Sequence, residues 1–310
     1  MSLLEDYTSS VSVVITTFNR PDFLYQALRS VVAQTHPIEQ IIVVDDCSPA
    51  SLDEVLKQFP EQNIVYERLD VNSGPNRARN RGVELATGYW VAFLDDDDAW
   101  LPEKLAEQFH AMSTTLNHED WRGSLCSYRY METQKDRFWG QTGAVELEVL
   151  KTGNPYCGAS GLVVKRDLIS ELKFDEALPC GQDWDIYVRL TKACSLLYVE
   201  TPLMLYRRGS HDSVTVKAKK LKIDNLQPRL AAIYKHRAWL GEEAFKRRVA
   251  MQTLAYVWDK QEPWLWVKES IRLAGLPSTV NALFQKLQAR VNKKLENSNY
   301  ESAHEQVISD

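Results

Sequence analysis

Residues 89 to 98 read Tyr89-Trp90-Val91-Ala92-Phe93-Leu94-Asp95-Asp96-Asp97-Asp98, an apolar run that ends in four consecutive carboxylates. A short continuous apolar run of this kind is typical of a strand that is buried on both faces of a sheet. In open parallel sheets, ligands bind beyond the carboxyl ends of the strands. The stretch therefore predicts a central strand that delivers an acidic cluster to a ligand site.

The sequence before this stretch alternates between strand and helix patterns. Short apolar runs predict strands over residues 11–16, 41–44 and 64–66. Apolar residues at helical spacing predict helices over about 21–32 and 77–86. Ser51 and Glu54 have the spacing of a capping box, which predicts a further helix that begins after Ser51 and extends to about Phe59. This alternation predicts an α/β fold, with a mostly parallel sheet covered by helices on both faces.

The pattern becomes irregular after a predicted helix over about 102–116. Strand candidates there are short and lie at residues 125–130, 162–165 and 196–200, which predicts a second half of mixed structure. From about Thr215 the sequence becomes helical and basic, with ten Lys or Arg against three acidic residues up to Arg248. Trp90, Trp100 and Trp184 each present an aromatic face that could stack on a ligand ring, but tryptophan at these spacings is more typical of a core.

Composition excludes several classes of protein. The 310 residues carry 37 basic and 42 acidic side chains, a net charge of −5, so the whole molecule does not attract nucleic acid. The five cysteines form no Cys-x-x-Cys pair, which argues against a disulfide framework or a structural zinc site. No signal peptide and no apolar run of about 18 residues is found. We therefore expect a cytoplasmic protein.

The four consecutive carboxylates favour a divalent cation. Adjacent carboxylates repel one another unless a cation or hydrogen-bond donors neutralise them, and Mg²⁺ or Mn²⁺ takes oxygen ligands shared with substrate phosphates. The alternative is a solvated acidic loop that caps the helix beginning near Pro102. No P-loop and no Gly-x-Gly-x-x-Gly follows the first strand, so a phosphate must be held by the metal and by side chains. The candidates are Arg77, Arg79 and Arg81, whose alternative is a solvent-facing helix edge.

Four linked motifs resemble family 2 glycosyltransferases of the GT-A fold. They are Val-Ser-Val-Val-Ile-Thr-Thr-Phe-Asn-Arg (11–20), Ile-Val-Val-Asp-Asp-Cys-Ser (42–48), Asn-Ser-Gly-x4-Arg-Asn-Arg-Gly-Val-x2-Ala-x-Gly (72–88) and Phe-Leu-Asp-Asp-Asp-Asp (93–98). The resemblance covers roughly residues 10–215. It implies a GT-A domain over residues 1–215, with a nucleotide-sugar half (10–100) and an acceptor half (120–215), followed by a helical extension over 216–310.

The resemblance also implies roles for individual residues of the nucleotide half. Thr16 and Phe18 would contact the base and ribose, although a tyrosine is common where Phe18 stands, and Asp46 would accept a hydrogen bond from the base. Asp95 to Asp97 correspond to the D-x-D element, in which Asp95 or Asp96 contacts the ribose and Asp97 coordinates Mn²⁺ or Mg²⁺ at the diphosphate.

The second half should supply the catalytic base. Cys180-Gly181-Gln182-Asp183-Trp184-Asp185 resembles the acidic motif of the family, which makes Asp183 the candidate, Asp185 its competitor and helix capping its alternative role. Gln182 replaces a glutamate that the family usually has. His211 lies in a stretch similar to Tyr-Arg-x-His with two residues inserted. It would complete the metal shell or contact the diphosphate; the alternative is an exposed loop histidine without a ligand.

These expectations combine into one predicted activity. An inverting, metal-dependent hexosyltransferase would move a sugar from a nucleoside diphosphate donor to a hydroxyl of a growing polysaccharide or glycolipid. The resemblance implies that the donor is a UDP-sugar. One alternative is a non-catalytic nucleotide-sugar-binding module, favoured by Gln182 and Phe18. Another is a sugar nucleotidyltransferase, but Asn19-Arg20-Pro21 does not supply its glycine-rich loop.

The basic stretch from Thr215 to Arg248 suggests a lipid-linked acceptor. Anionic lipid surfaces attract such segments by about 1 kcal/mol per basic residue, which would bring the enzyme to the inner membrane face as a peripheral protein. The alternative is a solvated helix face that packs on its own domain.

Overall fold

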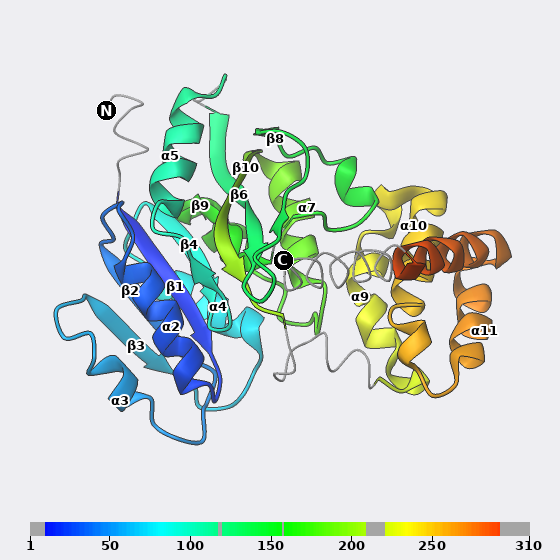
Figure 1. The fold of residues 1–310 in the computed structure, drawn as a ribbon, viewed down its shortest axis with the longest axis horizontal. Coiled ribbons are helices and arrows are strands. Elements are labelled where there is room, and N and C mark those ends of the chain that lie inside the picture. The colour runs from blue at the N-terminus through cyan, green and yellow to red at the C-terminus, as the bar shows by residue number, and fades with distance from the viewer. Residues whose placement is uncertain (1–9, 117–119, 157, 209–220, 292–310) are drawn as a thin grey trace, which may run out of the picture. The chain divides into compact units, whose positions relative to one another are not determined.

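The computed structural model describes residues 10–116, 120–156, 158–208 and 221–291 (Figure 1). The chain divides into two compact units, residues 1–209 and 210–310, each of which is described by itself. The boundary expected from the sequence, between residues 215 and 216, and the candidate metal ligand His211 both lie outside the described residues.

The first unit is an α/β structure. Its strands are β1 (Val11–Thr17), β2 (Gln40–Asp45), β3 (Ile64–Arg68), β4 (Trp90–Asp95), β5 (Ala99–Trp100), β6 (Trp121–Tyr130), β7 (Asp136–Arg137), β8 (Gly143–Ala144), β9 (Val163–Lys165) and β10 (Ser195–Tyr206). Its helices are α2 (Pro21–Val32), α3 (Asp53–Leu56), α4 (Pro75–Leu85), α5 (Lys104–Thr114), α6 (Arg166–Leu172) and α7 (Gln182–Ala193), with a 3₁₀ turn η3 (Ala159–Gly161).

One sheet joins the strands in the order β3-β2-β1-β4-β9-β6-β10-β5 (Figure 1). The first four strands are parallel, β9 runs antiparallel to both β4 and β6, and β10 is parallel to β6. The predicted parallel half followed by a mixed half is therefore confirmed. The register pairs Thr16 with Asp95 and Thr17 with Asp45, so the polar ends of β1, β2 and β4 meet at one edge of the sheet.

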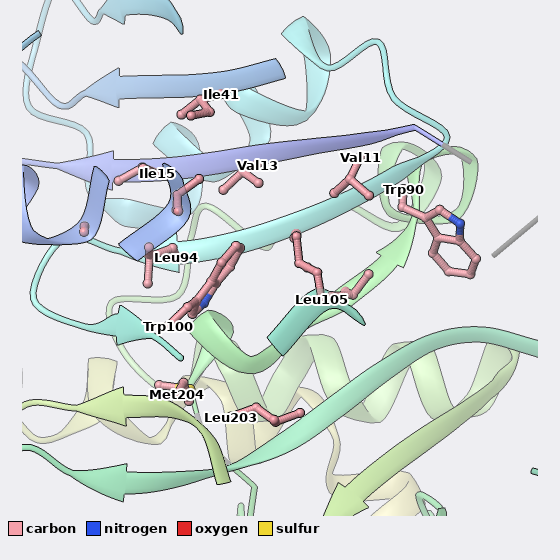
Figure 2. Packing of buried hydrophobic residues seen from close by; sticks show 14 of the residues in the cluster. Val11, Val13, Ile15, Ile41, Trp90, Leu94, Trp100, Leu105, Leu203 and Met204 are labelled. Atoms are coloured by element: carbon pink, nitrogen blue, oxygen red, sulfur yellow. The ribbon is translucent and has the colours of Figure 1, made fainter. Parts of the chain in front are cut away.

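Alternate residues of β1 pack on opposite faces of the sheet. Val11, Val13 and Ile15 belong to the buried cluster that also contains residues of α2 and α5, as Figure 2 shows for Leu105. On the other face, α4 approaches so closely at Gly82 that a Cβ there would lie 2.3 Å from Cγ1 of Val14. Helices on both faces leave the carboxyl edge of the strands as the open part of the sheet.

Two details differ from, or sharpen, the sequence expectations. The capping-box prediction is wrong: α3 begins at Asp53, the Ser51 hydroxyl accepts a hydrogen bond from the Asp53 amide at 3.0 Å, and Glu54 pairs with Lys57 at 2.6 Å. The reason is that Leu52 occupies the N-cap, so Ser51 lies one residue before the capping position. Trp90, Trp100 and Trp184 are buried, which makes them core residues, as their spacing favoured.

The second unit is helical where it is described. It contains α9 (Gln227–Lys235), α10 (Arg237–Thr253), α11 (Pro263–Ala274) and further helical residues at 276–291. Gly241, with φ at +70°, interrupts α10 with a kink. The predicted helical carboxyl-terminal extension is confirmed. In the part of the chain that the structure describes, none of the helices combines the length and the apolar character needed to cross a bilayer.

Candidate active site

Asp95 is the first carboxylate beyond β4. Its Oδ1 accepts a hydrogen bond from the Arg79 guanidinium at 2.6 Å and another from the Thr16 hydroxyl at 3.3 Å. Arg79 is buried on α4, whereas the Asp95 side chain is 28% exposed. The structure thus brings together three residues expected at the nucleotide, and it leaves Asp95 able to contact a ligand.

Asp96 is buried and held from two sides. Its Oδ2 accepts a hydrogen bond from the Thr17 hydroxyl at 2.8 Å, and its Oδ1 accepts one from Arg20 at 3.0 Å. The same Arg20 nitrogen lies 3.3 Å from Oδ2 of Asp97. Burial raises the pKa of Asp96 to about 7, the Arg20 cation opposes this rise, and the neighbouring Asp97 charge adds to it. Arg20 is therefore an internal cation of the acidic loop.

Asp98 fixes the shape of the loop rather than facing a ligand. Its buried carboxyl group accepts hydrogen bonds from the Ser160 hydroxyl at 2.7 Å and from the Arg207 amide at 3.1 Å. Ser160 also accepts the Asp95 amide at 3.1 Å, and Arg207 Nε donates to the Asp97 carbonyl at 3.0 Å. Burial and the Asp97 charge raise the pKa of Asp98 well above its ordinary value.

Asp183 is the second residue of α7, and its position differs from that of a helix cap. The residue at the cap position is Gly181, with φ at +73°. Asp183 Oδ1 is buried without a hydrogen-bond partner among the described residues. Burial raises the pKa of Asp183 to about 6, the Arg79 cation and a hydrogen bond from the Ala159 amide lower it, and the Asp95 charge raises it. An unpartnered carboxylate oxygen of this kind can accept a proton.

The competitor Asp185 is engaged elsewhere. Its Oδ2 is fully buried and pairs with Arg189 one turn along α7, at 2.9 Å from Nε and 2.7 Å from the second nitrogen. This ion pair ties Asp185 to its own helix, so the geometry favours Asp183 as the base.

The other nucleotide candidates lie on neighbouring strand ends. Phe18 follows β1 and is 42% exposed, so its ring is accessible for stacking. Asp46 follows β2, and its two carboxylate oxygens accept the amides of Ser73 and Gly74 at 2.7 and 2.8 Å. Asp46 thereby holds the loop before α4. Since a carboxylate oxygen has a second lone pair, a base nitrogen could still donate to it.

Only one of the three candidate arginines reaches the acidic loop. Arg77 lies 3.8 Å from Glu176, and Arg81 donates to Glu67 at 2.8 Å, so these two side chains are engaged at the helix surface, as the alternative expectation held. Sequence reasoning missed Arg20, Ser160 and Arg207 as supports of the loop. The only signal was that Arg20 and Arg207 lie within recognisable motifs.

The donor set suits a cation that brings further ligands with it. The partly exposed oxygens of Asp95 and Asp97, the latter 22% exposed, are hard donors of the type that Mg²⁺ and Mn²⁺ prefer. No group of three or more His, Cys, Asp and Glu side chains suitable for a metal occurs among the described residues. The residues therefore fit an ion that takes most of its ligands from a diphosphate and water, with one or two carboxylates from the protein.

Comparison with known proteins identifies the family. The protein family described as Glycosyl transferase family 2 matches this chain over residues 12–156. The uncharacterized glycosyltransferase YwdF of Bacillus subtilis is 31% identical over 268 residues, which cover 80% of this chain and 95% of that protein. The chain belongs to glycosyltransferase family 2. This family 2 glycosyltransferase is also 29% identical over 266 residues to the succinoglycan biosynthesis protein ExoO of Rhizobium meliloti, covering 81% and 72% of the two chains.

Solved structures confirm the GT-A fold of this glycosyltransferase. TarS of S. aureus, residues 1–349 in complex with UDP-GlcNAc, aligns with a TM-score of 0.59 at 15% identity, covering 90% of this chain and 92% of that fragment. The mannosyltransferase PcManGT of Pyrobaculum calidifontis, in complex with GDP-Man and Mn²⁺, aligns with a TM-score of 0.53 at 15% identity, covering 91% and 80%. At this identity the likeness shows the fold alone, and the bound ligands are those of the two neighbours.

Proposed function

We propose that this glycosyltransferase inverts the anomeric centre of a UDP-sugar, with Asp183 as the catalytic base and Asp97 as a metal ligand. The observation that carries the proposal is the Asp183 carboxyl group, whose Oδ1 is buried and unpartnered among the described residues. Burial raises the pKa of this group, Arg79 lowers it and Asp95 raises it. A proton acceptor within electrostatic reach of the nucleotide candidates suits a single displacement.

The proposed reaction is a single displacement at the anomeric carbon. The oxygen of an acceptor hydroxyl forms a bond to the anomeric carbon while its proton passes to the Asp183 carboxylate. The bond from the anomeric carbon to the diphosphate oxygen breaks, and its electron pair leaves with the diphosphate. Asp183 then releases the proton to solvent. Arg79 keeps Asp183 ionised, since its charge lowers the pKa of that carboxyl against the effect of burial.

The chain's own residues would bind and orient the donor. Phe18 would stack on the base, Asp46 would accept its ring N–H, Thr16 would line the ribose site, and Asp95 or Asp96 would contact the ribose hydroxyls. A divalent cation held by Asp97, with His211 as a further proposed ligand, would offset the charge that grows on the leaving diphosphate.

Donor and acceptor classes rest on the relatives. TarS structures contain UDP and UDP-GlcNAc, which supports a UDP-sugar donor for this chain. The Mn²⁺ in the PcManGT complex supports the use of a divalent metal. ExoO and the amylovoran biosynthesis glycosyltransferase AmsB of Erwinia amylovora are named for polysaccharide biosynthesis. We therefore infer that the acceptor is a saccharide or a lipid-linked saccharide. Peripheral membrane contact stays a prediction, because Lys217, Lys219 and Lys220 lie outside the described residues.

Nucleotide binding tests this proposal most directly. The thermal midpoint should be measured with UDP, GDP, CDP and ADP, each with and without Mn²⁺. A ligand at 100 times its dissociation constant stabilises a protein by about 2.7 kcal/mol, so UDP with Mn²⁺ should raise the midpoint by several degrees and more than the other pairs. Equal shifts for all nucleotides, or no effect of the metal, would contradict the assignment.

A non-catalytic binding module is the second candidate, because Gln182 and Phe18 depart from the family pattern. Both candidates predict nucleotide binding, so turnover separates them. Release of UDP from a panel of UDP-sugars with Mn²⁺, measured over hours, should exceed that of a protein-free control for at least one sugar. Absence of release for every sugar, with UDP still bound, would favour the binding module.

The rate should fall on the acidic side of about pH 6. Asp183 must be ionised to accept a proton, and its pKa of about 6 lies above the ordinary carboxyl value of 3.8. UDP release should be measured from pH 4.5 to 8, with a rise through pH 6 and a plateau above it. The pKa is raised in the folded state only, so ionised Asp183 lowers the stability of the folded protein above pH 6. Acidification from pH 6 to 4 protonates the group and should therefore increase the stability that depends on it. A flat profile down to pH 5 would exclude Asp183 as the base.

A further inference from the structure

Three tyrosine rings pack together at the carboxyl ends of β6 and β10. The Tyr128 ring lies 5.3 Å from that of Tyr130 and 5.4 Å from that of Tyr206, measured between centroids. The register of the two strands pairs Tyr130 with Tyr206. The short strand β7 pairs with β6 and places Arg137 beside Tyr128. This cluster belongs to the half of the sheet that the nucleotide candidates do not occupy.

Two guanidinium groups from distant parts of the chain share the Tyr130 ring. The central carbon of Arg208 lies 3.6 Å from the ring centroid, and that of Arg137 lies 5.5 Å from it. Arg208 also donates a hydrogen bond to the Tyr130 hydroxyl. Both arginine side chains are exposed at the surface. Stacking on one aromatic ring orients these two cations without neutralising them.

Nearby carboxylates are engaged with other groups. Asp136 binds Arg129 through both of its oxygens, at 2.5 and 3.2 Å. Glu132 accepts the backbone amide of Arg208 at 2.9 Å, so it meets the main chain of that residue. Neither the Arg137 nor the Arg208 guanidinium forms an ion pair within the described residues. Each of these exposed guanidinium groups can therefore donate charge-assisted hydrogen bonds to the oxygens of a bound anion.

The tyrosine cluster is linked to the acidic loop. Burial, and next the charges of Asp98 and Asp97, raise the pKa of the Tyr206 phenol. Arg207, between Tyr206 and Arg208 in the chain, donates to the Asp97 carbonyl and to the Asp98 carboxylate. Arg208 thus lies one residue beyond a contact of the proposed metal-binding loop, and Arg137 shares the Tyr130 ring with it. An anion bound to Arg208 would therefore lie near the proposed metal-binding loop.

We propose that Arg137 and Arg208 bind an anionic substituent, a carboxylate or a phosphate, on the acceptor saccharide. The inference rests on the proposed function, since it names the class of acceptor. Phe138 and Trp139, which directly follow Arg137, are 68% and 49% exposed and offer aromatic surface for the sugar ring next to the cations. A guanidinium fork matches the oxygens of a carboxylate or a phosphate, which explains arginine at both positions.

Matched sugars test the proposal on the intact protein. Dissociation constants should be measured by NMR titration for methyl β-D-glucuronide, glucose 6-phosphate and neutral methyl β-D-glucoside, with and without UDP and Mn²⁺. At least one anionic sugar should bind about tenfold more tightly than the glucoside, the order expected for a charge-assisted hydrogen bond. The tighter of the two anionic sugars identifies the substituent.

Variants assign the preference to the two arginines. Arg137→Gln, which alters an exposed side chain, and Arg208→Gln should each remove most of the preference, and Arg137→Lys should restore part of it. The matched control is Arg122→Gln, because Arg122 is exposed near the opposite end of the same strand β6 and should leave the preference unchanged.

The outcomes separate this proposal from the proposed function. Equal binding of neutral and anionic sugars by the wild-type protein would overturn the acceptor site, even if UDP binds. Weaker UDP binding in Arg137→Gln would also overturn it, since the cations would then serve the donor. Failure of the wild-type protein to bind any nucleotide would contradict the proposed function, while the sugar titrations without UDP would still test the arginine pair.

Discussion

Asp183→Asn is expected to lower the rate of sugar transfer by about 10²- to 10⁴-fold, the usual contribution of a general base, while UDP binding stays within about twofold. Asparagine keeps the shape of the side chain and removes the site that accepts the proton. The raised pKa of Asp183 means that the ionised carboxyl group is unfavourable in the folded state, so the variant should be at least as thermally stable as wild type at pH 8. Turnover, UDP affinity and the thermal midpoint should be measured on the same preparation.

Two controls make this result specific to Asp183. Glu171→Gln removes an exposed carboxylate on α6 and should leave all three quantities unchanged. Asp185→Asn breaks the buried pair with Arg189 and should lower the thermal midpoint, with any loss of rate following the loss of folded protein. Turnover of Asp183→Asn within about fivefold of wild type would exclude Asp183 as the base; a parallel loss of UDP affinity would assign it to the donor site instead.

Sequence patterns predicted the parallel half of the fold well because three of its four strands, β1, β2 and β4, are buried on both faces. Such strands leave nearly continuous apolar runs, and Val11 to Ile15 or Trp90 to Leu94 cannot be confused with surface helices. The strand ends were equally predictable from the sequence, because a polar residue directly after an apolar run must lie at the edge of the sheet. This is why Thr16 and Asp95, which are 79 residues apart, could be assigned to one site before their hydrogen bond was seen.

The groups that neutralise the four carboxylates of residues 95–98 were only partly predictable from the sequence. From the sequence we expected four adjacent carboxylates to need a cation or hydrogen-bond donors. The structure supplies both to its buried members from within: Arg20 and Thr17 contact Asp96, and Ser160 contacts Asp98. Ser160 lies 62 residues from its partner in a short 3₁₀ turn, so no local pattern marks it. Since the buried members are provided for, the partly exposed Asp95 and Asp97 are the ones left to meet a ligand.

Asp97→Asn is expected to abolish the Mn²⁺-dependent part of UDP binding and to lower turnover by about 10²-fold or more, because a metal contributes several kcal/mol to charge stabilisation at a leaving phosphate. Asparagine retains one oxygen but loses the negative charge that attracts the ion. The Asp97 carboxylate is partly exposed and lies 3.3 Å from Arg20. It can therefore bind either this internal cation or a metal ion. The difference between the thermal midpoints with UDP alone and with UDP and Mn²⁺ should disappear in the variant.

The position of the metal is decided by comparing neighbouring carboxylates. Asp70→Asn, an exposed acid that follows β3, should keep the full Mn²⁺ effect and so controls for overall charge. Asp95→Asn should weaken binding of UDP both with and without the metal, because Asp95 is proposed to contact the ribose and its loss also leaves Arg79 unpaired. If the Mn²⁺ effect persists in Asp97→Asn and vanishes in Asp95→Asn, the metal ligand is Asp95. If it persists in both, the acidic loop does not hold the ion, and the charges at this edge of the sheet serve only to bind Arg20 and Arg79.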